Sequence, residues 1–237
     1  LEPDSSITSF KNRFFLLLSM NITAIIPAYN EGHNIAKVIV GVKKYIKDII
    51  VVDDGSKDDT VEIAKQQNIT VLHHIINLGK GAALKTGVEY AKDADGFIFI
   101  DGDGQHSPEH IPEFIKALKE GHDIVFGYRQ INKSMPSILR FGNNVINAST
   151  KYLYGLPIKD STCGFRALTA HAYEKVKWDA SGYFVEGEMI ANAGNSKLTY
   201  TQIPIKTIYA DNYKGTHVMD GIKILGNMVA WKVKKWS

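Results

Sequence analysis

Short apolar runs alternate with helix-patterned segments through the first half of the chain, and this alternation limits the fold more than any other feature. The apolar runs predict strands at residues 22–26, 49–52, 70–72, 97–100 and 123–126. Helices are predicted between them, at residues 34–45, 60–67, 81–90 and 108–120. Alternation of this kind produces a mostly parallel sheet with helices on both faces. The sequence therefore predicts an α/β fold with a Rossmann-like sheet.

Two aspartates, Asp101 and Asp103, directly follow the apolar run at residues 97–100. Ligands of open α/β sheets bind at the carboxyl ends of the strands, and an Asp-x-Asp pair there can hold a hard divalent cation that grips a diphosphate. Gly102 and Gly104 allow the backbone to approach such a ligand closely. The alternative is a loop whose aspartates cap the helix that begins near Pro108. These residues alone leave both interpretations open.

Length and composition are those of one α/β domain. The chain has 237 residues, of which 44% are hydrophobic, and we expect residues 20–237 to form a single domain. A net charge of +3 gives no indication of nucleic-acid binding. The single cysteine, Cys163, excludes an internal disulfide, and a reducing cytosol is the simplest setting. No apolar run approaches the roughly 20 residues that cross a bilayer. Residues 1–19 are interpreted as an extension, surface-lying or vector-derived, outside the fold.

Past residue 130 the alternation stops. A helix carrying Arg140 is predicted within residues 134–154, and a compact polar loop at 160–166. A further helix is expected to begin near residues 183–188. Residues 198–205 have strand character, with Pro204 indicating an edge position or a strand end.

Seven short motifs follow one another along the chain. They are PAYNE at 27–31, VVDDGS at 51–56, NLGKGAAL at 77–84, DGDGQH at 101–106, GYR at 127–129, DSTCGFR at 160–166 and Glu-x-Glu at 186–188. In this order they resemble the inverting family 2 glycosyltransferases of GT-A fold. Within that family the chain is most similar to dolichyl-phosphate mannose or glucose synthases. The resemblance extends from about Ile22 to Lys223 and implies a GT-A fold.

The resemblance implies a nucleotide-sugar site at the strand ends. Its base, ribose and phosphate contacts would come from Pro27, Ala28, Tyr29, Glu31, Asp53, Asp54, Lys80, Asp101, Gly102 and Asp103. The family's metal triad matches Asp101, Asp103 and Gln105, an all-oxygen set that suits Mg²⁺ or Mn²⁺.

Some of these residues have simpler interpretations. The loop 27–31 could be an ordinary turn, and Asp53 or Asp54 could cap the helix that begins at Thr60. His106 is expected to be solvent-facing or hydrogen-bonded rather than a metal ligand. A late family loop often reads Gly-x-Ser-Lys, where this chain has Gly-Thr-His, so Lys214 or His217 is the candidate for the donor phosphates.

On the acceptor side, Arg129 and Arg140 match arginines that face an acceptor phosphate in the family, since guanidinium groups suit phosphate oxygens. Arg166 is either a third such arginine or, as we favour, the partner of Asp160 in an ion pair. Glu186 and Glu188 lie where the family places an acidic residue near the sugar, or they favour the start of the following helix. The catalytic candidates are therefore Asp103, Arg129, Arg140 and Glu186. Cys163 is expected to be a packed side chain.

The activity implied is the transfer of a single hexose from a nucleotide sugar, of GDP-mannose or UDP-glucose type, to a polyprenyl (dolichyl) phosphate. The Gln-x-x-Arg-Trp signature of processive members is absent, which favours one transfer over polymer synthesis. A phosphate acceptor is already anionic and needs no general base. The rival is a soluble glycan or other hydroxyl acceptor, which requires a catalytic carboxylate from Glu186, Glu188 or Asp160.

The carboxyl-terminal segment, residues 221–236, combines aliphatic and aromatic residues with lysines and is predicted to form an amphipathic helix. Such a helix suits a lipid surface, and packing on the domain is the alternative. We expect a cytoplasmic protein that lies peripherally at the cytoplasmic face of a membrane.

Overall fold

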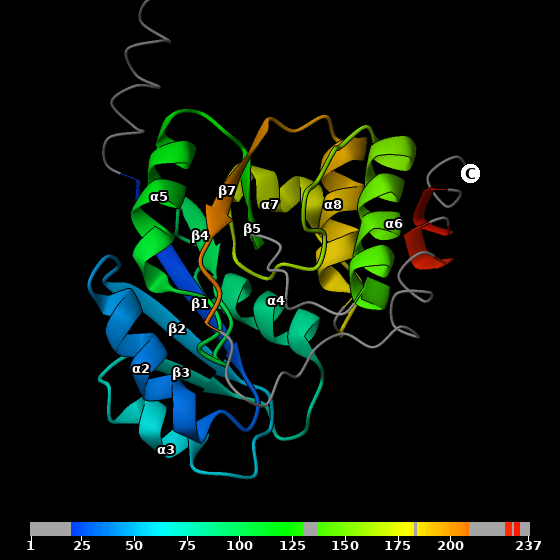
Figure 1. Ribbon diagram of the computed structural model, residues 1–237. Helices are drawn as coiled ribbons and strands as arrows, with labels where there is room; N and C mark the ends of the chain where they lie inside the picture. Colours follow the sequence, from blue (N-terminus) through cyan, green and yellow to red (C-terminus); the bar gives the residue numbers. More distant parts are fainter. Residues whose placement is uncertain (1–19, 130–136, 183, 209–225, 229, 233–237) are drawn as a thin grey trace, which may run out of the picture.

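The computed structural model describes residues 20–129, 137–182, 184–208, 226–228 and 230–232, and the side chains of all of these except 137–144. It is an α/β domain built on one sheet (Figure 1). The strands are β1 (Ile22–Ala28), β2 (Asp48–Asp53), β3 (Thr70–His73), β4 (Gly96–Phe99), β5 (Ile124–Arg129), β6 (Arg166–Thr169) and β7 (Tyr200–Ile205). The helices are α2 (Gly32–Lys43), α3 (Thr60–Lys65), α4 (Lys80–Tyr90), the short 3₁₀ helix η1 (Pro108–His110), α5 (Ile111–Lys119), α6 (Ser137–Tyr154), α7 (Ala170–Val176) and α8 (Val185–Asn195).

In the described part of the chain, the sheet has seven strands in the order β3-β2-β1-β4-β6-β5-β7. Strand β1 pairs in parallel with β2 and β4, and β5 pairs in parallel with β7. Only β6 runs against its two neighbours, β4 and β5. The carboxyl ends of β1, β2 and β4 therefore meet at one edge. The predicted mostly parallel sheet is confirmed.

Strand β6 was not predicted, because the sequence indicated a polar loop up to Arg166. The strand has only four residues, and it pairs Phe99 with Arg166 and Gly96 with Thr169. A charged residue opening a buried strand gives a weak sequence signal, since its burial depends on partners that only the folded chain brings. Strand β7 lies at the edge of the sheet, in agreement with the position indicated by Pro204.

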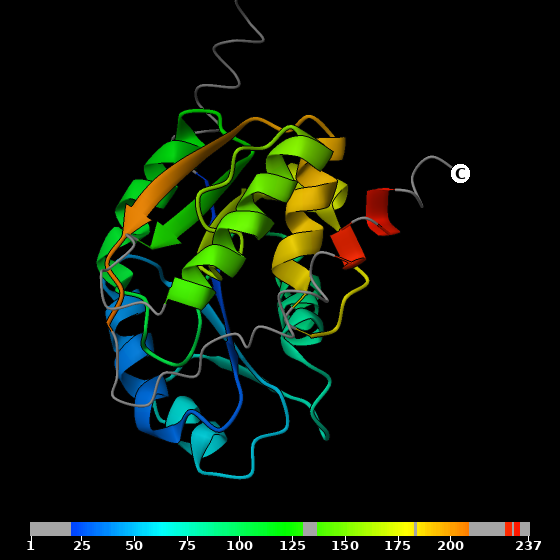
Figure 2. The same cartoon turned by 45° about the vertical axis from the view of Figure 1, so that its right-hand side comes forward.

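The core lies on both faces of the sheet. In β4, Ile98 belongs to the apolar cluster under α2 and α5, while Phe97 and Phe99 belong to the cluster under α4, α7 and α8. This alternation follows from the two-residue repeat of a strand, and both faces are buried because helices cover both. Figure 2 shows α2 and α5 on one side of the sheet and α4 and α8 on the other.

Helix α2 begins at Gly32, two residues before Asn34, where the sequence predicted its start. The Asn34 amide donates to the Glu31 carboxylate at 2.9 Å, so it does not cap the helix. The helix start is held from the next loop, where Thr60 Oγ1 accepts the Glu31 N–H at 2.9 Å and Asp58 accepts the Gly32 N–H at 3.1 Å. These contacts attach the PAYNE turn to the segment that leads from β2 into α3.

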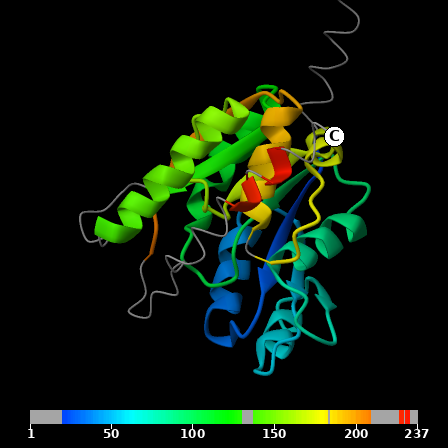
Figure 3. The ribbon, with the colours of Figure 1, turned by 90° about the vertical axis from the view of Figure 1, so that its right-hand side faces the viewer.

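The described part of the carboxyl-terminal segment is helical and packs on the domain. Met228 is fully buried against Ile146, Tyr154 and Ala191, and Trp231 packs against the same cluster. The Tyr154 hydroxyl also donates to the Met228 carbonyl. Figure 3 shows this segment beside α8. Packing on the domain is thus observed for residues 226–228 and 230–232; the rest of the predicted helix, like residues 1–19, lies outside the described residues. Within the described chain, no helix is long and apolar enough to span a bilayer.

Candidate functional site

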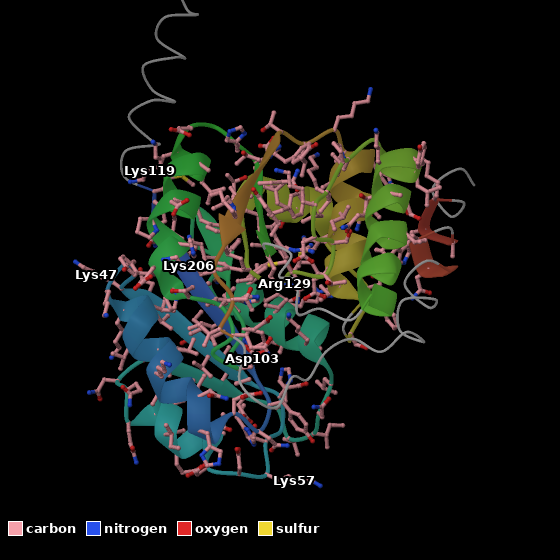
Figure 4. All side chains as sticks on the ribbon, in the orientation of Figure 1. Lys47, Lys57, Asp103, Lys119, Arg129 and Lys206 are labelled. Atoms are coloured by element: carbon pink, nitrogen blue, oxygen red, sulfur yellow. The ribbon has the colours of Figure 1, made fainter. Side chains whose placement is uncertain are left out.

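The Asp101–Asp103 loop leaves β4 at the edge where β1 and β2 also end. The Gly102 N–H donates to the Pro27 carbonyl at 3.3 Å. A Cβ atom on Gly102 would lie 3.1 Å from that carbonyl oxygen and 3.3 Å from the Ala28 Cβ, so a glycine allows the two loops to touch. In Figure 4 the labelled Asp103 and Arg129 lie within the outline of the molecule, while Lys57 projects outward. The structure brings Pro27, Ala28 and Gly102 together as predicted.

Lys80, the first residue of α4, joins two carboxylates at this edge. Its Nζ lies 2.6 Å from Asp101 Oδ1 and 2.7 Å from Glu186 Oε1. Burial alone would lower the pKa of Lys80, but the charges of Asp101 and Glu186 raise it above its usual value. Burial alone would raise the pKa of Asp101, and the Lys80 ammonium lowers it below its usual value. Lys80 and Asp101 are therefore charged, and the contacts of Lys80 with Asp101 and Glu186 connect the starts of α4 and α8 to the end of β4.

The DSTCGFR loop lies directly on this ion cluster. A Cβ atom on Gly164 would lie 2.5 Å from both Asp101 Oδ2 and Lys80 Nζ. A larger side chain there would displace the Lys80 ammonium and the Asp101 carboxylate from each other. The glycine in this motif is thus a consequence of contact with two residues, Asp101 and Lys80, that lie far earlier in the chain.

Asp103 is positioned by its own loop, with its Oδ1 accepting the Gln105 N–H at 2.9 Å. Burial and the negative charge of Asp101 raise the pKa of Asp103 above its usual value. A divalent cation between the two carboxylates would relieve this repulsion. The carboxylate and amide oxygens of Asp101, Asp103 and Gln105 are the donors that Mg²⁺ and Mn²⁺ prefer, so the residues present fit such an ion.

Two other observations bear on that site. Within the described ranges no three His, Cys, Asp or Glu side chains are arranged as a metal site. A cation would therefore need the amide of Gln105 or oxygens of the bound donor to complete its coordination. The alternative role of the aspartates as helix caps is wrong, because neither η1 nor α5 receives a side-chain cap hydrogen bond.

Asp54, at the end of β2, holds the NLGKGAAL loop. Its carboxylate accepts the N–H groups of Leu78 at 2.9 Å and Gly79 at 2.7 Å, and lies 2.8 Å from His74 Nδ1. Gly79 has a φ of 96°, a backbone conformation that favours glycine. Asp54 therefore positions the turn that delivers Lys80.

Asp53 is fully buried, and one of its two carboxylate oxygens has no hydrogen-bond partner among the described residues. Its Oδ2 accepts the Ser56 N–H at 3.0 Å and lies 2.8 Å from His73 Nδ1. Its Oδ1 has no hydrogen-bond partner among the described residues. Neither Asp53 nor Asp54 caps α3, whose N-cap is Asp59, and that alternative is wrong.

The PAYNE turn presents Tyr29 at the surface, where its side chain is 42% exposed. Asn30 has a φ of 54°, and its N–H donates to Ser56 Oγ at 2.8 Å. The turn is therefore fixed to the VVDDGS loop rather than being an isolated turn.

Arg129, rather than Arg166, forms the ion pair with Asp160. Arg129 Nε donates to Asp160 Oδ2 at 2.7 Å and its Nη2 to Oδ1 at 2.9 Å, with a further bond to Thr162 Oγ1 at 2.7 Å. Burial alone would raise the pKa of Asp160, but bonding to Arg129 lowers it below its usual value. Arg140 belongs to α6, and its side chain lies outside the described residues, as do Lys214 and His217.

The predicted pair between Arg166 and Asp160 is wrong. The fully buried Arg166 instead donates to the carbonyl oxygens of Ser161 at 2.9 Å, Cys163 at 2.9 Å and Glu186 at 2.7 Å. A guanidinium can do this because it has five donors in a fixed plane. Arg166 thus holds the DSTCGFR loop against the start of α8.

Glu188 has its oxygens engaged by backbone groups. It accepts the Asp179 N–H at 3.1 Å and the Ala180 N–H at 2.8 Å. The loop that it holds lies against α4, since the Trp178 indole donates to the Gly81 carbonyl at 2.9 Å. Of the two glutamates in the Glu-x-Glu motif, only Glu186 reaches the Lys80–Asp101 pair.

His106 is buried, so a solvent-facing position is wrong. Its Nδ1 lies 3.7 Å from Asp101 Oδ2, and its Nε2 lies 4.0 Å from Cys163 Sγ. The sequence did not pair His106 with Cys163, because the two are 57 residues apart. The packed position predicted for Cys163 is confirmed, since the residue is 1% exposed.

We expect the Cys163 thiol to be unreactive in the folded protein. Burial raises its pKa to about 12, so the nucleophilic thiolate is scarce at pH 8. A chromogenic disulfide reagent at pH 8 should give no signal until guanidinium chloride is added, and then one thiol per chain. The Cys163→Ser variant, which has no cysteine, gives the background signal of the reagent. Reaction of the native protein within seconds would contradict this burial.

Comparison with known proteins places this geometry in a family. The model of glycosyl transferase family 2 matches residues 23–177. A Methanococcus voltae protein named UDP-N-acetylglucosamine--dolichyl-phosphate N-acetylglucosaminyltransferase is 34% identical over 243 residues, covering 90% of this chain and 97% of the relative. The polyprenol monophosphomannose synthase of Mycolicibacterium smegmatis is 28% identical and covers 90% and 85%.

Among solved structures, glucosyl-3-phosphoglycerate synthase of Mycobacterium tuberculosis, crystallised with Mn²⁺, UDP and glucosyl-3-phosphoglycerate, matches with a TM-score of 0.72. The match covers 99% of this chain and 85% of that one at 20% identity, which confirms the GT-A fold. Since the family model spans more than half of the chain and the relatives are matched over most of their length, this chain belongs to glycosyl transferase family 2.

Proposed function

We propose that this glycosyltransferase moves one hexose, with inversion, from a nucleotide sugar to a polyprenyl phosphate. The observation that carries the proposal is the state of the three carboxylates that could activate a hydroxyl acceptor. Asp160 is bound to Arg129, Glu186 to Lys80, and Glu188 to two backbone amides. A general base must be able to accept the proton of its substrate. An acceptor that is already anionic needs none of the three.

The donor would lie across the ends of β1, β2 and β4. The unpartnered Oδ1 of Asp53 suits an N–H of the base, and Tyr29 and Glu31 border the same loop. Asp101, Asp103 and Gln105 would hold Mg²⁺ or Mn²⁺. When bound, the ion would stabilise the charge of the departing nucleoside diphosphate as a Lewis acid.

Lys80 and the later loop complete the proposed donor site. Lys80 orients the Asp101 carboxylate and stands next to the place where the phosphates would lie. Lys214 or His217 is the proposed further cation for these phosphates.

Arg129 and Arg140 are the proposed contacts of the acceptor phosphate. The bidentate pair with Asp160 fixes the plane of the Arg129 guanidinium, and Thr162 adds a third anchor. An arginine held in this way is already oriented when an anion binds and loses little side-chain entropy on meeting phosphate oxygens. Positioning and desolvation of the phosphate oxygen would then be the chain's main contribution at this end.

Two named relatives support a lipid phosphate as the acceptor class. One carries dolichyl phosphate in its name and the other is a polyprenol monophosphomannose synthase. The glucosyl-3-phosphoglycerate synthase has the same fold and a soluble product, so fold alone does not choose the acceptor.

The deciding experiment follows radiolabelled sugar from UDP- and GDP-hexoses with Mn²⁺, with and without a polyprenyl phosphate. We expect label in the organic phase only when the lipid is present. The Glu186→Gln variant should retain transfer within about tenfold, because an amide oxygen can still accept from Lys80 and removal of a true base costs 10²–10⁴-fold. Label appearing only on a soluble hydroxyl acceptor, together with a larger loss in Glu186→Gln, would favour the rival.

We further propose that residues 20–237 form one domain that binds the cytoplasmic face of a membrane through its carboxyl-terminal segment. Residues 221–236 carry four lysines beside aliphatic and aromatic residues. The described residues of this segment are packed on α6 and α8, so only its remaining face would contact lipid. At low salt, the protein should float together with liposomes of anionic lipid. At high salt, a smaller fraction of the protein should float with them. Recovery of all protein in the soluble fraction at both salt concentrations would refute the membrane contact.

A further inference from the structure

Two buried side chains, Cys163 and His106, lead from the DSTCGFR loop to Asp101 at the candidate metal site. Cys163 Sγ lies 4.0 Å from His106 Nε2, and His106 Nδ1 lies 3.7 Å from Asp101 Oδ2. Cys163 is 1% and His106 6% exposed. We infer that Cys163 and His106 form a hydrogen-bonded relay that fixes the orientation of the Asp101 carboxylate for its metal. This inference rests on the proposed function of Asp101 as a metal ligand.

The direction of the relay follows from the thiol. A buried cysteine remains protonated, so Cys163 can donate its S–H to His106 Nε2. A neutral imidazole carries one proton, and Nε2 as acceptor leaves that proton on Nδ1. Nδ1 has no hydrogen-bond partner among the described residues, and the acceptor that faces it is Asp101 Oδ2. A small rotation of the carboxylate that shortens this distance by about 0.5 Å would form the hydrogen bond.

The imidazole cannot easily turn away from Asp101. Its ring packs against Phe165 with 5.9 Å between centroids, and Phe165 stacks on Phe114 at 4.3 Å. The backbone of His106 is bridged to Thr207. On the thiol side, a Cβ atom on Gly127 would lie 3.2 Å from Cys163 Sγ, so little space is left for that side chain to move.

Asp101 is therefore held from two sides. Lys80 binds Oδ1 and His106 faces Oδ2. Partners of this kind orient a metal-binding carboxylate before the ion arrives, and their loss typically weakens metal binding 10- to 100-fold. His106 is a positioning residue in this arrangement, because it acts through Asp101.

The tautomer can be tested directly. Two-bond proton–nitrogen correlation spectra of the native, ¹⁵N-labelled protein should show one neutral histidine protonated at Nδ1. The His106→Gln variant, which lacks that signal, assigns it. In Cys163→Val, which removes the donor to Nε2, the signal should shift towards the other tautomer. An Nε2-protonated His106 in the unsubstituted protein would overturn the relay.

Metal binding tests the consequence. We expect His106→Phe, which keeps a ring but removes the donor, to weaken Mn²⁺ binding in the presence of UDP or GDP by about 10- to 100-fold in calorimetry. His106→Asn places an N–H near the position of Nδ1 and should restore most of the affinity. Equal Mn²⁺ affinity in the unsubstituted protein and His106→Phe would refute the inference, as would failure of the unsubstituted protein to bind Mn²⁺. If the His106 tautomer and the Mn²⁺ affinities are as expected but no sugar is transferred to polyprenyl phosphate, the proposed function is refuted instead.

Discussion

Replacing Asp103 with asparagine should lower kcat/KM for sugar transfer about a thousand-fold, since in the proposed mechanism the variant loses a charged oxygen ligand of the metal where negative charge develops on the leaving diphosphate. The fold should survive. Burial and the charge of Asp101 raise the pKa of Asp103, which means that its ionised form is unfavourable in the folded protein without a cation. Removing that charge should leave the free energy of unfolding in EDTA unchanged or higher. Steady-state transfer assays and denaturant titrations measure the two quantities.

A matched control is Asp48→Asn. It changes an exposed aspartate at the amino end of β2, at the opposite edge of the sheet from the carboxyl ends that form the candidate site. Its kcat/KM should remain within about twofold of the unsubstituted enzyme, because surface substitutions of this kind have small effects. An Asp103→Asn variant as active as the Asp48→Asn control would remove the basis for a metal-assisted reaction at this loop.

Lys80→Met is expected to destabilise the fold by about 3–5 kcal/mol, the usual cost of removing one member of a buried ion pair. The side chains of Lys80 and Glu186 are 14% and 8% exposed, so water cannot replace the lost contacts. Asp101 and Glu186 would be left as neighbouring negative charges without a cation. The free energy of unfolding in urea measures the loss, and Lys85→Met, an exposed lysine on the same helix, should change it by less than about 0.5 kcal/mol.

A double substitution separates charge from packing. Adding Glu186→Gln to Lys80→Met removes one of the two unpaired carboxylates and should recover part of the lost stability. Glu186→Gln alone should destabilise the protein. The two effects should therefore be strongly non-additive, as is usual for residues in contact. Additive losses would show that the ion cluster is not formed in solution.

Most of the fold could be predicted from local patterns. The strands β1, β2, β4 and β7 were each predicted within two residues of their observed bounds and β5 within three, because buried parallel strands are continuous apolar runs. Strand β6 was missed, since Arg166 is stable in a buried strand only through the three carbonyl oxygens that accept from its guanidinium.

The sequence predicted which residues form the candidate site but not which of them contact one another. Asp101, Asp103, Lys80 and Glu186 were named individually, yet their meeting at Lys80 Nζ depends on where α4 and α8 begin relative to β4. The exchange of partners between Arg129 and Arg166 has the same cause, because Asp160 lies in a loop whose course is fixed by Arg166 itself. Neither set of contacts can be deduced from the order of residues in the sequence.

The sequence by itself determined the α/β class, the position of the polar strand ends and the family, because strand and helix periods and short motifs are local properties of the chain. Tertiary structure decided which oxygen faces which nitrogen: Lys80 between two carboxylates, Asp160 on Arg129, and His106 between Cys163 and Asp101. The energy of an interaction between buried charges depends on the distance between them and on how far water is excluded around them. Both are set only when segments remote in sequence pack together.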